Sequence, residues 1–440
     1  MGLSRSLSIG TSSLRANQQK FDVISNNLAN TNTVGFKSTR ANFEDQLSQV
    51  YTRGHSPNQS GGIGTGGINP MQYGLGVKVG SIQQNMQQGV IETTDRPLDL
   101  ALQGDGFFIY QDNGISKYSR AGAISRDKDG YFVDNNTGAF LQGYNVQVDA
   151  NGKIVTDSTG ANLLTGKLSD IQITNDVISQ PKQSQNITLN GNLNSSMATG
   201  DTRRTSINIF DNIGGVHTLE FIFTKSANPN EFTLSGSLDG NALTLPTTTV
   251  TFNADGTLKS PMSLNILASN LNTLLGTQVF DATTPKNLTI QLAPANQLTS
   301  GLTQYSMPST ASFGTQDGYK MGNLQDLTVD KEGKIWGAFT NGKSEILGQV
   351  IIAKFPNQEA LVRVGDNMFV PAPNSGEAIV GTAGEIFKAT NIISNSLEQS
   401  NVDIATQFTE MISTQRAFEA ASRTITVSDT LLQEINSLKR

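Results

Sequence analysis

Residues 404–432 read IATQFTEMISTQRAFEAASRTITVSDTLL, with an apolar side chain at every seventh position. The repeating side chains are Ile404, Met411, Phe418, Ile425 and Leu432. Near the other end of the chain, the same spacing recurs in Leu7, Leu14, Phe21 and Leu28. A strict seven-residue repeat is typical of a coiled-coil seam. The sequence therefore predicts two long terminal helices that pack through these residues, which are candidate assembly contacts.

The alternative is a pair of ordinary amphipathic helices that cover a globular core, because Phe408, Ala421 and Ile435 widen the C-terminal stripe. The N-terminal helix also contains Gly10 and many Ser and Asn residues, which are poor helix formers. Isolated helices of such composition are marginal in water. We therefore expect the two ends to be largely disordered in a free subunit and to fold on assembly.

The middle of the chain has the pattern of β-structure. Short apolar runs such as GDGFFIYQ and KIWGAF are separated by turn signals, among them Asp129-Gly130, Asp255-Gly256 and Asn341-Gly342. Because this middle connects the two ends, helices that pair within one subunit must run antiparallel. We expect a mainly β protein whose long terminal helices form an antiparallel, coiled-coil-like inner layer.

Composition divides the chain into four expected parts. The same pattern of short apolar runs separated by turn signals occurs in residues 78–145 and 318–392. These two segments should therefore form one discontinuous inner β domain. The Thr- and Asn-rich block between them should be a domain inserted in a loop of that inner domain. The parts are a terminal helical assembly domain (1–30 and 401–440), a connector (31–77 and 393–400), the inner β domain (78–145 and 318–392) and the inserted outer β domain (146–317).

Composition also excludes several classes of function. The chain of 440 residues has no cysteine and only two histidines, His55 and His217, so the usual soft ligands for zinc, haem-thiolate or iron–sulfur sites are missing. We expect no metal and no cofactor. The net charge of −6 provides no electrostatic footprint for nucleic acid. No apolar run is long enough to span a bilayer, and the first residues lack the apolar region of a cleaved signal peptide.

One stretch of the sequence matches a nucleotide-binding motif. Residues 337–344, GAFTNGKS, satisfy the phosphate-loop spacing, with Lys343 and Ser344 as the candidate phosphate ligands. A functional phosphate loop needs a helix after it, so that N–H groups at the helix N-terminus face the phosphates. Here the next residues, EILGQVIIA, are rich in β-branched side chains. We therefore interpret the match as a β-hairpin with its turn at Asn341-Gly342, and a nucleotide hydrolase as the less favoured alternative.

Several blocks resemble the bacterial flagellar rod and hook proteins. Residues 25–37, SNNLANTNTVGFK, are similar to the N-terminal signature of that family, and residues 97–108, PLDLALQGDGFF, agree with it. The shorter blocks that agree are YSRAG (118–122), LQGY (141–144), SNVDI (400–404), QRAF (415–418) and LKR (438–440). The block 146–317, which contains VHTLEFIF and NADGTL, resembles the outer domain of the hook members; the rod members are shorter.

The resemblance implies a structural subunit of the flagellar hook, which self-assembles into a flexible curved tube that transmits torque from rod to filament. The alternative that it leaves open is the distal rod of the basal body. It further implies an extracellular homopolymer that contacts a rod protein at its proximal end, together with hook-capping and hook–filament junction proteins. Without a signal peptide, export would depend on the flagellar export apparatus. No catalytic residue is expected.

Overall fold

The computed structural model describes residues 2–57, 66–148, 154–157, 161–281, 286–294 and 301–438. Parts of the expected connector and insert, and the terminal Lys439 and Arg440, therefore lie outside the described residues. The chain divides into two compact units. Unit 1 comprises Met1–Thr174, Leu327–Trp336 and Ile346–Arg440, and unit 2 comprises Asn175–Asp326 and Gly337–Glu345.

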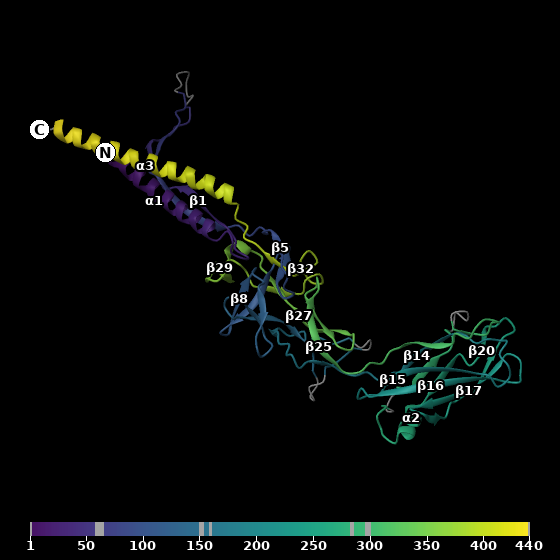
Figure 1. Ribbon diagram of the computed structural model, residues 1–440. Coiled ribbons are helices and arrows are strands. Elements are labelled where there is room, and N and C mark those ends of the chain that lie inside the picture. Colours follow the sequence, from purple (N-terminus) through teal and green to yellow (C-terminus); the bar gives the residue numbers. More distant parts are fainter. Residues whose placement is uncertain are drawn as a thin grey trace. The chain divides into compact units, whose positions relative to one another are not determined.

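The terminal helices belong to unit 1 and pair with each other. Helix α1 spans Gly2–Ala29 and helix α3 spans Ile404–Leu438, and they lie side by side in Figure 1. Ser6 contacts Ser428 near one end of the pair, whereas Asn27 contacts Gln407 near the other. The two helices therefore run antiparallel, which confirms the prediction.

Strands from both sides of the insert pair within unit 1. Strand β7 (Phe107–Asp112) pairs with β8 (Ile115–Ser119), β11 (Phe140–Asn145) and β28 (Ile352–Lys354). Buried Phe107, Ile109, Ile351 and Phe369 belong to one apolar cluster of this unit. The further elements are β5 (Ile91–Thr93), β6 (Leu100–Gln103), β9 (Ile124–Arg126), β10 (Phe132–Asp134), β12 (Ser169–Asp170), η1 (Gln358–Ala360), β29 (Val362–Arg363), β30 (Met368–Val370), β31 (Ile379–Gly381), β32 (Asn391–Ser394) and β33 (Ser396–Glu398). Pairs β5–β33, β6–β32 and β8–β30 also join the two sides.

The expected connector contains strands that the sequence analysis did not predict. Strand β1 (Thr39–Asp45) pairs with β4 (Val77–Gln84), and β2 (Ser48–Thr52) pairs with β3 (Met71–Gly74). All described residues of β2 and β3 are exposed. The β2–β3 pair is held by its backbone ladder rather than by an apolar core, so it has no buried face that would give its sequence a regular apolar pattern.

Unit 2 is a β-sandwich. Its elements are β13 (Ile178–Ser179), β14 (Asn186–Asn192), β15 (Thr202–Phe210), β16 (Val216–Lys225), β17 (Glu231–Leu238), β18 (Asn241–Leu243), β19 (Thr249–Phe252), β20 (Leu258–Ser260), β21 (Ser263–Ile266), α2 (Ala268–Leu275), β22 (Leu288–Gln291), β23 (Leu302–Thr303) and β24 (Ser312–Gln316). One sheet has the order β15-β16-β17-β19-β20 and another has β21-β22-β14-β23. Both contribute to one core that includes Phe221, Phe232 and Ile290. Strand β16 alternates between buried and less buried residues, as expected for a strand with one face on a core. Helix α2 was not predicted.

Strands β25 (Gly322–Val329), β26 (Lys334–Phe339) and β27 (Ser344–Val350) contribute residues to both units. The first border between the units falls after Thr174. The reason is that β12 pairs with β11 and that Ile171 and Ile173 are buried in unit 1. The segment that follows β11 thus packs on the body of unit 1 before the chain enters unit 2.

Candidate assembly surface on the terminal helices

The seam between α1 and α3 is made mostly of small and polar side chains. On α3 it follows Gln407, Thr414, Ala421 and Ser428, a seven-residue repeat whose last three members are buried. On α1, Gly10 is buried against Ile425: a Cβ at Gly10 would lie 2.8 Å from Cγ1 of Ile425. Small residues at these positions let the two helix backbones approach closely.

Polar contacts set the register of the seam. The hydroxyls of Ser6 and Ser428 are 3.2 Å apart. The amide of Asn27 donates to Oε1 of Gln407 at 3.1 Å, and its Nδ2 also donates to the carbonyl of Thr39 at 2.7 Å. The Lys20 ammonium lies 3.6 Å from the Glu410 carboxylate, but both side chains are substantially exposed. Asn27 therefore ties α3 and β1 to the same turn of α1.

The predicted stripe residues lie beside this seam, and none of them is fully buried. Phe21, Ile404 and Phe418 are exposed, by 39 %, 47 % and 42 % of their surface. The half-buried members are Leu7, Leu14, Leu28, Met411, Ile425 and Leu432. Phe21, Met411 and Phe418 line a cavity of about 520 Å³ between the helices. The predicted seven-residue repeat is thus present on both helices, but its apolar side chains are only partly buried within the chain.

Helix α3 exposes further apolar side chains. Ile412 continues the exposed line of Ile404 and Phe408 at intervals of four residues. Near the other end, Val427 and Leu431 continue to Ile435 with the same spacing. Ile412, Val427 and Leu431 were not among the sequence-predicted contacts, although their four-residue spacing is a helical signal. A helix with apolar residues on several faces is normally buried.

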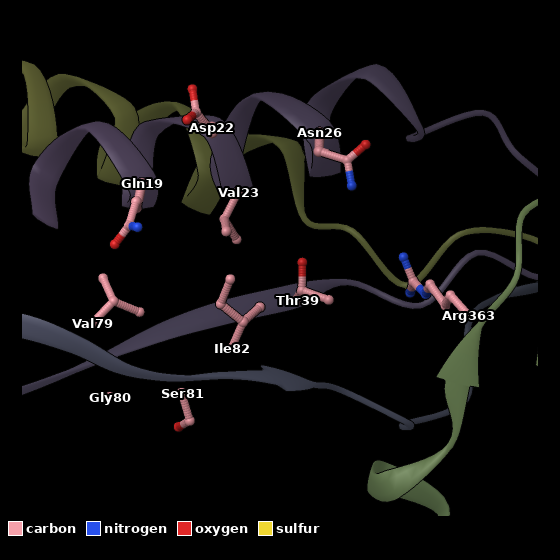
Figure 2. A pocket seen from close by; sticks show the side chains of 10 residues that line it. All are labelled: Gln19, Asp22, Val23, Asn26, Thr39, Val79, Gly80, Ser81, Ile82 and Arg363. Carbon is pink, nitrogen blue, oxygen red and sulfur yellow. The ribbon is translucent and has the colours of Figure 1, made fainter. Parts of the chain in front are cut away.

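The opposite side of α1 borders a groove over the β1–β4 pair (Figure 2). Val23 points from α1 toward Ile82 of β4, with Thr39 of β1 beside it. The groove has a volume of about 660 Å³, and Asp22 and Arg363 lie at its polar border. Ile82 is exposed. This groove is a second partly apolar surface on the N-terminal helix.

A buried ionic cluster fixes the segments that lead to the two helices. The Lys37 ammonium lies 2.5 Å from Oε1 of Glu398, and Arg120 Nη1 lies 3.4 Å from Oε2. Lys37 also donates to the carbonyl of Gln87 at 2.7 Å, and the N–H of Gly89 donates to Glu398. All three charged side chains are at most 1 % exposed.

Burial lowers the pKa of Lys37 from its ordinary value, and the negative charge of Glu398 opposes that shift. Burial likewise lowers the pKa of the Arg120 guanidinium, again against the attraction of Glu398. The Arg363 guanidinium lies 4.6 Å from the centre of the Phe36 ring and donates to the carbonyl of Lys37. The cluster therefore holds the segment after α1, the segment before α3 and the β body together within unit 1.

The phosphate-loop match lies in a hairpin, as predicted. Strand β26 ends at Phe339 and β27 begins at Ser344, so a strand follows where a phosphate loop requires a helix. The Asn341 side chain accepts the N–H of Lys343 at 3.1 Å. The Lys343 ammonium lies 4.9 Å from the centre of the Tyr319 ring. Its charge is thus placed on an aromatic face rather than in a nest of N–H groups.

Among the described residues, no group of three or more His, Asp or Glu side chains is arranged to hold a metal ion. Within the same residues, the helices are too short or too polar to cross a membrane.

Unit 1 thus joins a β-rich body to paired terminal helices whose apolar residues stay partly exposed. Three family models match the chain, and all three describe flagellar basal body proteins. They are "Flagella basal body rod protein" at residues 7–37, "Flagellar basal body protein FlaE D2 domain" at 188–319 and "Flagellar basal body rod FlgEFG protein C-terminal" at 393–438.

Full-length relatives narrow this class. The chain is 33 % identical to "Flagellar hook protein FlgE" of Treponema pallidum, over 99 % of this chain and 100 % of the relative. It is 33 % identical to the protein of that name from Borreliella burgdorferi, over 99 % of both chains. For the protein from Escherichia coli the identity is 30 %, over 97 % of this chain and 98 % of the relative. The chain belongs to the flagellar hook protein family and is a structural subunit of the hook. The hook interpretation is thereby confirmed over the distal rod.

Proposed function

We propose that copies of this chain assemble into the hook through the exposed faces of α1 and α3. The supporting observation is the incomplete burial of the stripe: Phe21, Ile404 and Phe418 each keep about two fifths or more of their surface open. Burying a large apolar side chain contributes roughly 1.5–3 kcal/mol. The proposed contact residues are Leu7, Leu14, Phe21, Leu28, Ile404, Met411, Phe418, Ile425 and Leu432.

The polymer in this proposal is a flexible curved tube that transmits torque from rod to filament and has no enzymatic role. Low charge and abundant Thr, Asn and Ser on the β units support flexibility, because buried charge pairs between subunits would fix one register. The proposed partners are a rod protein at the proximal end, hook-capping and hook–filament junction proteins, and the flagellar export apparatus. The proposed location is extracellular, after export without a cleaved signal peptide.

Domain roles follow from the same proposal. The terminal helices (1–30 and 401–440) form the assembly domain, joined by the connector (31–77 and 393–400) to the inner β domain (78–145 and 318–392). The inserted outer β domain (146–317) adds outer contacts between subunits. Pairing of β7 with β28 and of β8 with β30 supports an inner domain built from two segments of chain.

Electron microscopy of polymers from single variants tests the assembly contacts. Leu14→Asp and Phe418→Asp each place a charge where an apolar neighbour is expected, at a cost of several kcal/mol once buried and unpaired. Because the loss recurs at every subunit, tubes should be absent while the β units stay folded by circular dichroism. The matched control is Ser413→Asp, at an exposed polar position of the same helix. Normal tubes from Leu14→Asp and Phe418→Asp would contradict the proposed contacts.

A further inference from the structure

The hairpin between β7 and β8 closes through a two-residue turn, Asn113-Gly114. Asp112 pairs with Ile115, and both turn residues have positive φ, 49° for Asn113 and 82° for Gly114. This is the conformation that Asn-Gly adopts in tight hairpins. Both turn residues are exposed, and no heavy atom lies within 4 Å of the position that a Cβ on Gly114 would take.

We propose that Asn113 is a site of spontaneous deamidation and isoaspartate formation, selected by the structure from among the Asn-Gly pairs of the chain. The backbone nitrogen of Gly114 attacks Cγ of Asn113, so an N–Cγ bond forms and the Cγ–Nδ2 bond breaks. The Gly114 proton leaves with Nδ2 as ammonia, and a cyclic imide remains. Water then opens the ring at either carbonyl, which yields aspartate or isoaspartate without any change of oxidation state.

Ring closure requires a free nucleophile and a side chain that can rotate toward it. Within the described residues, the Gly114 N–H makes no hydrogen bond. The Asn113 side chain makes one hydrogen bond, from Nδ2 to Oδ1 of its neighbour Asp112 at 2.9 Å. Because Gly114 has no side chain, its nitrogen can approach Cγ with little steric hindrance. Both requirements are met at this turn.

Asn341-Gly342 has the same two residues in a hairpin but lacks this freedom. Nδ2 of Asn341 donates to Ser179 and to the carbonyl of Lys320, both at 3.0 Å, and its Oδ1 accepts the N–H of Lys343. The Gly342 N–H donates to the carbonyl of Phe339 at 2.9 Å. The side chain and the nucleophile are therefore both held.

Asn190-Gly191 is held in another way. Asn190 lies in β14 opposite Ser312 of β24, so its backbone is fixed in an extended conformation. The Gly191 N–H donates to the carbonyl of Gly301 at 3.4 Å. A fourth pair, Asn151-Gly152, lies outside the described residues.

Isoaspartate at position 113 would change the end of the hairpin. It adds one carbon to the main chain of a two-residue turn, which is incompatible with the Asp112–Ile115 pairing. It also adds a carboxylate beside Asp112, whose Oδ2 now lies 2.6 Å from the Lys117 ammonium. Buried Phe107 and Ile109 lie further along β7 in the core, so the change should stay at the hairpin tip.

The test is an ageing experiment on the full-length chain at mildly alkaline pH and physiological temperature. Isoaspartate is labelled with protein isoaspartyl methyltransferase and assigned by peptide mapping. In the folded chain, the rate at Asn113 should exceed the rates at Asn190 and Asn341 by about tenfold or more, which corresponds to about 1.4 kcal/mol in barrier height. In concentrated urea the three rates should converge, because the reacting residues are the same.

Two results would overturn the proposal. The first is that Asn113 reacts no faster than Asn341 in the folded chain. The second is that its advantage persists in urea, because the advantage would then be an effect of local sequence rather than of the fold. Asn113→Gly is the matched variant: Gly tolerates the positive φ of the turn but has no side-chain amide. It should lose the signal at this peptide and leave the signals of the other Asn-Gly peptides unchanged.

Discussion

The ammonium of Lys37 and the carboxylate of Glu398 lie 2.5 Å apart, although 361 positions separate them in the chain. Lys37 follows α1, whereas Glu398 ends β33 shortly before α3 begins. A backbone hydrogen bond joins the same two segments, because the Gly35 N–H donates to the carbonyl of Glu398 at 2.7 Å. The segments that join the two terminal helices to the β body are thus fixed to each other.

Breaking this pair should destabilise unit 1. Glu398→Gln leaves the buried charge of Lys37 without its counter-ion and removes the carboxylate that pairs with Arg120, and removing one partner of a buried pair costs about 3–5 kcal/mol. The measurement is urea unfolding followed by fluorescence of Trp336, the single tryptophan of the chain, which lies in unit 1.

The matched control for this measurement is Glu44→Gln. Glu44 lies 3.3 Å from Lys78, but both side chains are more than half exposed. Exposed pairs contribute about 0–1 kcal/mol. Equal losses from Glu44→Gln and Glu398→Gln would show that the buried cluster does not stabilise unit 1.

The ionised carboxylate of Asp317 should stabilise unit 2, and this stabilisation should be lost in acid. Burial tends to raise the pKa of Asp317, but hydrogen bonds from the N–H groups of Asn186 and Gln185 outweigh it and lower the pKa below 3.8. A lowered folded-state pKa stabilises the fold above the unfolded pKa, and that stabilisation disappears as the pH falls through the folded value.

Asp317→Asn should therefore weaken protection of β14 against amide exchange at neutral pH, and the difference from the wild type should shrink below pH 3.8. Peptide-resolved exchange, corrected for intrinsic rates, provides the measurement. Asp255→Asn is the control, because the Asp255 carboxylate accepts hydrogen bonds from Thr257 of its own turn and, among the described residues, from no other strand. A difference at β14 that is constant with pH would contradict the role of the Asp317 charge.

A single methyl group added at Gly10 should weaken the packing between the terminal helices. Gly→Ala inside a helix normally gains about 1 kcal/mol. At Gly10, however, the new Cβ would lie 2.8 Å from Cγ1 of Ile425, so the helices must separate. Gly10→Ala should lower the temperature at which assembled tubes depolymerise, whereas Thr11→Ala, at an exposed position of the same helix, should not.

A double-mutant cycle isolates the contact. Ile425→Ala alone should also lower that temperature, because it removes apolar contact. Combined with Gly10→Ala, its effect should be smaller than the sum, with a coupling of about 0.5–3 kcal/mol. Strict additivity would show that the two residues do not meet in the assembled hook.

The sequence predicted the helices and their period, but it did not show which positions of the period would be fully buried. The apolar repeat through Leu14 and Phe418 can be recognised in the sequence. The buried residues Gly10, Thr414 and Ser428 are small or polar, so no apolar pattern marks them as buried. Which face of a helix meets its partner depends on both surfaces, so one pattern cannot determine it. In the same way, Lys37 and Glu398 look like surface charges until the fold removes them from water.

The terminal helices should be largely unprotected in the free subunit. The buried seam on α3 consists of small and polar residues, while Phe21, Phe408 and Phe418 keep about two fifths or more of their surface exposed. Helix nucleation is costly, and tertiary packing must supply most of the stability of a helix. The polar composition of α1, with Gly10 and several Ser and Asn residues, adds little propensity.

Amide exchange on the monomer, compared with exchange in assembled tubes, measures this directly. Peptides from 2–29 and 404–438 should exchange rapidly in the monomer and slowly in the tube, whereas peptides from β7 should be protected in both states. The buried residues of β7 provide that internal control, because Phe107 and Ile109 are at most 1 % exposed. Protection of both helices in the monomer, equal to that of β7, would show that the subunit alone stabilises them and that folding is not coupled to assembly.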